Sequence, residues 1–311
     1  MKETSPEMIL NREVFTIDCE AECHRIESLI QQKMAELHRA GIVVSISGGL
    51  DSSTVVTLCA RAAGKENVTG LILPEKHGNP DAAAFAKKLS GSLGITTALV
   101  DISKILSALG TYDFIAERIG LRGIVKEAVR RIPAEQIKEF FLAGMRGNGS
   151  AVVRQGLASM YSKHRIRMVV TYKYAEERNL LVVGCAHKSE DLVGLFSKYG
   201  VDDNADVMPL KHLYRSQILQ LARFLGVPMD IIARTPNPDM LPGIEDKYWD
   251  VLGLHSETLD LVLYGLEQGL SCDEIADQLP LELAKVHEIR DLVQSTAHMR
   301  HHAFSLLDQN G

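Results

Sequence analysis

The residues with the clearest chemical potential form the stretch SGGLDS at positions 47–52. Two adjacent glycines allow positive φ and a close approach of the backbone to a ligand, so that successive N–H groups point into one concavity. The hydroxyls of Ser47 and Ser52 are further donors to phosphate oxygens. Asp51 would repel a bare phosphate, but it fits if it holds Mg²⁺ that itself binds the phosphate. The stretch therefore predicts a cradle for a polyphosphate and its metal ion.

The position of this stretch supports the same prediction. Residues 42–46, IVVSI, are short, β-branched and unalternating, as expected of a central parallel strand buried on both faces, and a helix is expected through about residue 63. An anion is favoured where such a helix begins. No Lys-Ser or Lys-Thr follows the glycines and the GxGxxG spacing is missing, so this is neither a Walker A loop nor a dinucleotide fingerprint. A second interpretation stays open, in which the turn only caps the helix through Asp51 and Ser52.

The rest of the chain predicts the elements that position this loop. Further strands are expected at 68–73, 96–100 and 180–184, with helices at 81–93 and 214–225. Strands that alternate with helices indicate βαβ units with right-handed crossovers and a ligand at the carboxyl ends of the strands. The predicted fold class is α/β, a doubly wound parallel sheet with a helical C-terminal extension.

The two ends of the chain are predicted to be helical. A helix at 18–40, with Asp18 as N-cap and Gly41 as stop, is expected to pack on the core, and Ser271 is expected to cap a helix of the C-terminal part. The predicted division is a helix within 1–40, a nucleotide-handling domain at 41–240 with a helical insertion at about 103–160, and a helical extension of the same domain at 241–311.

Composition excludes several classes of protein. The 311 residues include 34 Lys and Arg against 40 Asp and Glu, a net charge of -6, which argues against nucleic acid as the main partner. No apolar run approaches the roughly 18 residues that span a bilayer, so no membrane insertion is expected. The first residues carry neither a signal core nor a transit pattern, and the five cysteines are scattered, so a reducing cytoplasmic location is expected.

A second group of motifs gives the chain a family resemblance. These are RIRM at 165–168, Tyr172, VVGCAHKSE at 182–190, GLFSKYG at 194–200 and DVMPL at 206–210. With the loop at 47–52, which resembles the pyrophosphate loop of the ATP pyrophosphatase (adenine nucleotide alpha hydrolase-like, Rossmann-like) superfamily, their order and spacing resemble the ammonia-dependent NAD synthetases. The similarity covers roughly residues 40–300.

The resemblance implies a ligase that forms a C–N bond: ATP-dependent amidation of deamido-NAD to NAD by ammonia, through an adenylate, with release of AMP and pyrophosphate. ATP is the co-substrate and Mg²⁺ the metal. It assigns ATP to Ser47, Gly48, Gly49, Asp51, Ser52, Leu73, Arg167, Cys185, Arg215 and Asn237, and Mg²⁺ to Asp51 and Glu190. It assigns the substrate side to Arg165, Tyr172, Asp202, Asp206 and His298.

Catalysis is assigned to Asp51, Arg167 and Lys198, because the two cations can neutralise charge that develops on the α-phosphate and the departing pyrophosphate. For each arginine a surface ion pair stays open as an alternative, and for Tyr172 and Asp206 a packing or capping role does. His298, His301 and His302 fit a polar helix face better than a metal site.

The resemblance also implies partners. With 311 residues there is no room for a fused glutaminase, so free ammonia or a separate glutaminase must supply nitrogen. A homodimer is implied by resemblance alone.

The chain departs from the family pattern in residues that touch the acceptor side. These are Tyr161, His164, Ile244, Lys247 and Met299, and Cys185 stands where the family has Thr. Three alternatives follow: a related ATP pyrophosphatase that amidates or ligates another carboxylate, a sulfur transferase that uses Cys185, or a nucleotide sensor without turnover.

Overall fold

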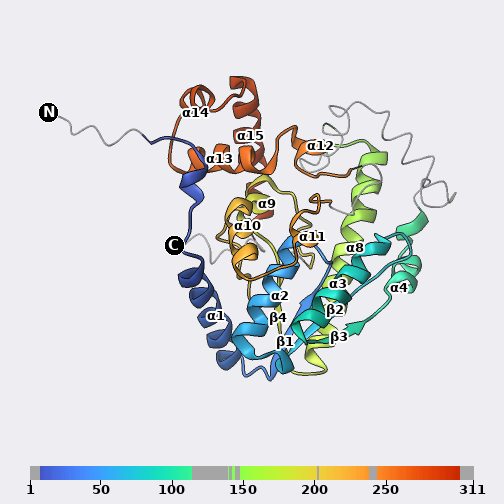
Figure 1. Cartoon of the computed structure of the whole chain (residues 1–311). Helices are drawn as coiled ribbons and strands as arrows, with labels where there is room; N and C mark the ends of the chain where they lie inside the picture. Colours follow the sequence, from blue (N-terminus) through green and yellow to red (C-terminus); the bar gives the residue numbers. More distant parts are fainter. Residues whose placement is uncertain are drawn as a thin grey trace, which may run out of the picture.

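The computed structural model describes residues 8–113, 139, 142–143, 148–201, 203–237 and 244–301. Within these ranges the sheet has four strands, β1 Gly41–Ser45, β2 Val68–Ile72, β3 Thr96–Leu99 and β4 Leu180–Val183. Every pairing is parallel and the order is β3-β2-β1-β4 (Figure 1). The predicted parallel sheet is confirmed.

Helices cover both faces of this sheet, because β1 has apolar side chains on each side. Ile42 and Val44 pack with α1 Cys19–Glu36, α2 Leu50–Ala63, α3 Pro80–Leu93 and α10 Arg215–Phe224. Val43 instead packs with α4 Ser103–Ala108 and α8 Ala151–Glu176 on the other face. The doubly wound α/β fold is therefore confirmed.

The strand order places a topological switch point between β1 and β4. From β1 the chain steps outward to β2 and β3, whereas β4 pairs with the other edge of β1. Loops that leave neighbouring strands in opposite directions open a crevice at the carboxyl ends of the strands, which is where open α/β sheets bind ligands.

Helix α1 begins as predicted but ends earlier. The Asp18 carboxylate accepts hydrogen bonds from the N–H groups of Glu20 (3.1 Å) and Ala21 (3.0 Å), so it is the N-cap. The predicted end at residue 40 is wrong, because the helix ends at Glu36 and His38 has a φ of 52°. Contacts distant in sequence favour this turn: the Asn179 side-chain amide donates to the His38 carbonyl at 3.0 Å.

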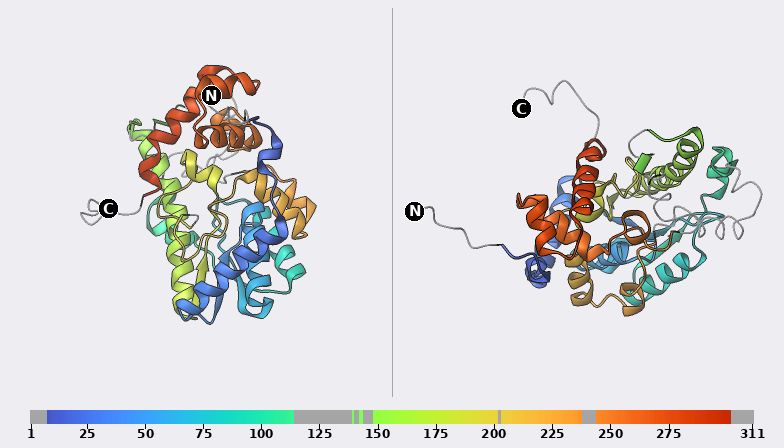
Figure 2. Two further views of the ribbon diagram at one scale, coloured as in Figure 1. Left: turned by 90° about the vertical axis from the view of Figure 1, so that its left-hand side faces the viewer. Right: turned by 90° about the horizontal axis from the view of Figure 1, so that it is seen from above.

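The C-terminal part forms a second group of helices (Figures 1 and 2). Its members are α13 Ser256–Glu267, α14 Cys272–Gln278 and α15 Leu283–Ser295. Three short helices precede them in the chain: α9 Lys188–Val193, α11 Met229–Ile232 and α12 Trp249–Leu252. Single 3-10 turns lie at Arg12–Phe15, Lys65–Asn67, Thr111–Asp113 and Ala297–Met299. Ser271 caps α14 in a capping box with Glu274, as its sequence predicted.

These C-terminal helices have an apolar core of their own, which also takes in Phe15 and Tyr214. The two rings lie 5.2 Å apart and join the first turn of the chain to the start of α10. Most of the predicted insertion at 103–160 lies outside the described residues. In the part of the chain that is described, we find no helix long and apolar enough to cross a membrane.

Candidate active site

The loop between β1 and α2 is built for close approach to a ligand. Gly48 has a φ of 71°, and a Cβ added there would lie 2.6 Å from Cβ of Phe85. The Ser47 hydroxyl lies 3.1 Å from that of Ser52 and accepts from the Gly49 N–H at 3.3 Å. Gly49 is the N-cap of α2, and no described side chain caps this helix. The first-turn N–H groups suit an anion, which favours the cradle interpretation of the loop over the capping interpretation.

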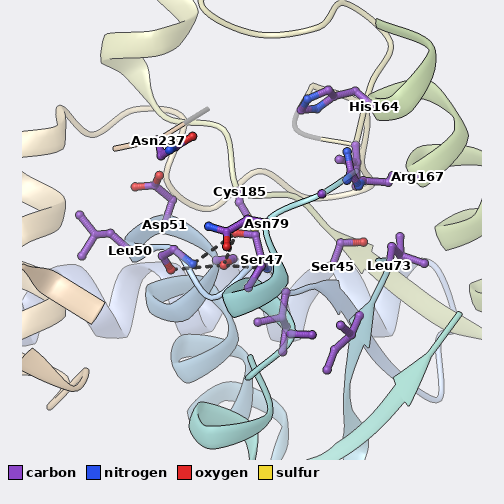
Figure 3. Close-up of a pocket in the computed structure, with 18 of the residues that line it drawn as sticks. Ser45, Ser47, Leu50, Asp51, Leu73, Asn79, His164, Arg167, Cys185 and Asn237 are labelled. Atoms are coloured by element: carbon purple, nitrogen blue, oxygen red, sulfur yellow. Dashed lines mark hydrogen bonds between the residues drawn. The ribbon is translucent and has the colours of Figure 1, made fainter. Parts of the chain in front are cut away.

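A cavity of about 410 Å³ opens beside this loop, at the carboxyl ends of β1, β2 and β4. Figure 3 shows Asp51 and Asn237 at one end of it, His164 and Arg167 at the other, and Cys185 between them. Ten of the sequence-predicted residues line this cavity: Ser47, Gly49, Asp51, Ser52, Leu73, Arg167, Cys185, Glu190, Arg215 and Asn237. Six chain segments that are distant in sequence therefore contribute to one pocket.

Two carboxylates that line the pocket form a cluster with a buried histidine. The Nε2 atom of His187 lies 3.2 Å from Oε1 of Glu190 and 3.9 Å from Oδ1 of Asp51. One ligand atom from each residue falls within 4.8 Å of the others. Oδ1 of Asp51 is buried and has no hydrogen-bond partner among the described residues. A buried carboxylate oxygen that accepts no hydrogen bond, beside a second carboxylate, fits a divalent cation.

The charges around this cluster keep Asp51 ionised. Burial alone would raise the pKa of Asp51, but the positive charges of Arg215 and Lys247, and of His187 when it is protonated at low pH, outweigh it and lower that pKa. Nη1 of Arg215 lies 3.6 Å from Asp51 Oδ1. Burial lowers the pKa of His187 to about 4, against the attraction of Asp51, so its imidazole is neutral at pH 7 and can act as a metal ligand.

A buried hydrogen-bond network from the C-terminal helices supports the cluster. Asp260 of α13 accepts from the Ser189 hydroxyl at 2.6 Å and from both the N–H (2.8 Å) and hydroxyl (2.6 Å) of Ser216. The Ser189 hydroxyl in turn accepts from the Arg215 N–H at 2.9 Å. Burial raises the pKa of Asp260 in spite of the donors from Ser189 and Ser216. The network ties the starts of α9 and α10, which carry Glu190 and Arg215, to the C-terminal extension.

The other end of the pocket holds a second buried charge pair. Glu75, which follows β2, lies 3.2 Å from Nζ of Lys163 on α8, and the two side chains are 1% and 6% exposed. The Tyr112 hydroxyl (2.7 Å) and the His77 N–H (2.8 Å) also donate to Glu75. Because Arg167 lies one turn further along α8, this pair fixes the helix that brings Arg167 to the pocket.

Several residues predicted for catalysis or for the acceptor side lie outside the lining of this pocket. Lys198 donates to the carbonyl of His298 at 2.9 Å, and Arg165 donates to the carbonyl of Lys198 at 3.2 Å. The Tyr172 hydroxyl donates to Asp206 at 3.2 Å.

Asp206 also accepts from the Val182 N–H at 2.9 Å, which favours the structural role that was left open for it. Gly48 lies in the loop but not in the lining, and Asp202 lies outside the described residues.

Other lining residues were not predicted as site residues. Among them are five polar or charged residues, Glu75, Asn79, His164, Arg234 and Lys247. His164 and Lys247 appeared only as departures from a family pattern, and His187 only as a letter in a motif. Arg234 had no sequence signal, because it reaches the site through a 2.6 Å hydrogen bond to the carbonyl of Gly48, which is 186 positions earlier.

Known proteins resemble the chain over most of its length. The NAD synthase family model matches residues 22–303. An NH₃-dependent NAD⁺ synthetase of Coprothermobacter proteolyticus is 36% identical over 272 residues, which are 85% of this chain and 91% of that protein. Another, from Methanocaldococcus jannaschii, is 32% identical over 89% of this chain and 93% of its own length.

Solved structures agree in fold. An NMN synthetase from Francisella tularensis matches with a TM-score of 0.68 and 22% identity, over 93% of this chain and 99% of the other. An NH₃-dependent NAD synthetase from Campylobacter jejuni, in complex with nitrate, matches with a TM-score of 0.66 and 24% identity, over 94% and 100% of the two chains. At these identities the structures support the fold alone.

Proposed function

Because the chain belongs to the NAD synthase family, we propose that it is a ligase that amidates deamido-NAD to NAD with ammonia, at the expense of ATP. The observation that carries the proposal is the pocket at the β1 and β4 ends, where the glycine loop meets the cluster of Asp51, His187 and Glu190. Backbone donors beside carboxylates suit a polyphosphate that arrives with a divalent cation.

The proposed reaction has two steps. A carboxylate oxygen of deamido-NAD attacks the α-phosphorus of ATP, the bond to the bridging oxygen breaks, and pyrophosphate leaves an acyl adenylate. Ammonia then attacks the acyl carbon, AMP leaves with the former carboxylate oxygen, and a proton is lost to give the amide. Both steps form negative charge on phosphate oxygens, which fixed cations stabilise.

The chain supplies these cations from both sides of the pocket. Arg215 is 5% exposed and is positioned by Asp51, while Arg167 lines the opposite end on α8. The N–H groups of the loop and the hydroxyls of Ser47 and Ser52 are the donors proposed for the β- and γ-phosphates. Asp51 and Glu190 are the residues proposed to hold Mg²⁺, with the neutral His187 beside them, and Mg²⁺ would offset the charge of the polyphosphate.

The acceptor side rests on the family. Arg165, Tyr172, Asp202, Asp206, His298 and the catalytic role of Lys198 stay predictions. A homodimer, a separate glutaminase and a cytoplasmic location also stay predictions.

The test is an assay of the purified chain with ATP, Mg²⁺, ammonium and deamido-NAD, in which AMP and NAD are both measured. We expect equal amounts of AMP and NAD, and none of either without ammonium. Parallel arms replace deamido-NAD by nicotinate mononucleotide and by simple carboxylates. AMP release with one of these acceptors but not with deamido-NAD would assign the chain to another carboxylate.

A matched pair of variants tests the metal assignment within α9. Glu190→Gln removes a carboxylate of the cluster, whereas Asp191→Asn removes the next one, which faces Lys211 at 3.2 Å. We expect turnover to fall by more than about 100-fold in the first, as when one charge-stabilising group is lost, and by less than about threefold in the second. Near-normal turnover in Glu190→Gln would refute this assignment.

A further inference from the structure

Lys247 places a buried cation directly on the carboxylate cluster. Its Nζ contacts Oε1 of Glu190, and its side chain is only 14% exposed. It lines the same pocket as the glycine loop, and the proposed reaction does not yet use it.

The two carboxylates of the cluster have unequal partners. Oε1 of Glu190 is shared between Lys247 and Nε2 of His187, which is 3.2 Å away. Oδ1 of Asp51 is buried without a hydrogen bond. A divalent cation held by these carboxylates would compete with the ammonium of Lys247 for Glu190, because like charges repel strongly in a partly buried site. Lys247 must therefore leave Glu190 when the cation binds.

The backbone around Lys247 is held, so only its side chain has to move. The Lys247 N–H donates to the Pro236 carbonyl at 3.1 Å, and Asp246 accepts from the N–H of Tyr248 at 2.8 Å. Tyr248 is fully buried. A flexible four-carbon stem on a fixed backbone can move its ammonium between two acceptors a few ångströms apart.

The acceptor available to the displaced ammonium is the ligand of the pocket. Asp51 already has Arg215 beside it, and Glu190 would be occupied by the metal, so neither has need of a second cation. A polyphosphate held by the loop would place several anionic oxygens in the same cavity.

We propose that Lys247 is a polyphosphate-binding residue that neutralises Glu190 before nucleotide and divalent cation enter, and that then exchanges this carboxylate for phosphate oxygens. This inference rests on the proposed function in that the polyphosphate is taken to be that of ATP. This exchange makes the binding of metal and of phosphate mutually dependent. The metal alone would neutralise Glu190 but leave Lys247 without a partner, and phosphate alone would pair with Lys247 but leave Glu190 without one.

The test measures binding of Mn²⁺ alone, and of inorganic pyrophosphate in the presence of Mn²⁺, to Lys247→Gln and to the wild type. With one positive charge removed, we expect Mn²⁺ alone to bind on the order of tenfold tighter and pyrophosphate on the order of tenfold weaker. The matched control is Lys211→Gln, which removes a lysine paired with the next acid of α9 outside the pocket lining, and both affinities should stay within about twofold.

Opposite shifts distinguish exchange from a structural role. Weaker binding of both probes, or no change in either, would overturn the proposal. If Lys247→Gln does not fold, Lys247→Arg decides: it keeps the charge, so Mn²⁺ should bind as weakly as to the wild type, and tighter Mn²⁺ binding would contradict the exchange. Neither probe needs deamido-NAD, so failure of the amidation assay and failure of this inference are separate results.

Discussion

Replacing Lys163 with methionine is expected to destabilise the fold by about 3–5 kcal/mol, because it leaves the buried carboxylate of Glu75 without its counter-ion. The two charges are 3.2 Å apart, which corresponds to about 5 kcal/mol of attraction at an effective dielectric constant near 20. A double-mutant cycle with Glu75→Gln should show a coupling of about 2–3 kcal/mol, because the double variant buries no unpaired charge. Urea unfolding of the four proteins measures these values.

The stability of the wild type and that of Lys163→Met should depend on pH in opposite directions. Burial would raise the pKa of Glu75, but Lys163 and the hydrogen bonds from His77 and Tyr112 outweigh it and lower that pKa. The pair therefore contributes its full stability above the ordinary pKa of a glutamate, and loses it as the pH falls through the lower pKa of the folded state. In Lys163→Met, burial dominates and raises the pKa of Glu75, so lowering the pH from 7 to 5 should stabilise the variant relative to the wild type.

A control variant on the same helix separates the effect of losing a buried ion pair from the effect of replacing a lysine with methionine in a helix. Lys173 pairs with Glu177 on the surface of α8, with a side chain that is 70% exposed. Lys173→Met should cost less than about 1 kcal/mol, as exposed ion pairs do. If Lys163→Met costs no more than Lys173→Met, or if its stability has the same pH slope as the wild type, the reasoning about the buried pair is refuted.

Three further predictions concern the pocket and its support. Gly48→Ala should weaken Mg²⁺-ATP binding by at least about tenfold in calorimetry, because its Cβ would clash with Phe85. The control is Gly226→Ala, which has a φ of 72° and open space around it: it should lower the free energy of unfolding by only about 1–2 kcal/mol through backbone strain. Equal ATP affinities of the Gly48→Ala and Gly226→Ala variants would contradict this prediction. Asp260→Ala should lower the free energy of unfolding by about 3 kcal/mol or more, because three donors lose their acceptor, and an unchanged urea midpoint would be the opposing result. Cys185→Ser should keep AMP release within about threefold of the wild type, since the proposed amidation needs no thiol, and complete loss would favour sulfur chemistry.

Local patterns were sufficient to predict the elements that carry the glycine loop. Five residues of β1 are apolar or small and nearly all are buried, which the unalternating run at 42–46 predicted. The caps at Asp18 and Ser271 were also predictable, because a cap depends on side chains within three residues of the helix start. The end of α1 was not, because a hydrogen bond from Asn179 holds the turn at His38.

In the candidate site, too, the residues that depend on local sequence were predictable and those that depend on tertiary packing were not. The glycine loop and the Glu190 segment each directly follow a strand, so their motifs could be recognised and the sheet brings them together. Arg234, Lys247 and Asp260 each reach the site from a part of the chain in which the described residues form no strand, and tertiary packing places them there. The role of Lys247 could not be predicted from the sequence, because it depends on the contact with Glu190, which is distant in the chain.

The most direct test of the proposed reaction follows the oxygen atoms of the substrate. Deamido-NAD labelled with ¹⁸O in its carboxylate is converted with ATP, Mg²⁺ and ammonium, and the products are analysed by mass spectrometry. Attack of the carboxylate on the α-phosphorus predicts one labelled oxygen in AMP and none in pyrophosphate, with one AMP formed for each NAD. Unlabelled AMP, or label in inorganic phosphate with formation of ADP, would contradict the adenylate route and the function proposed for this pocket.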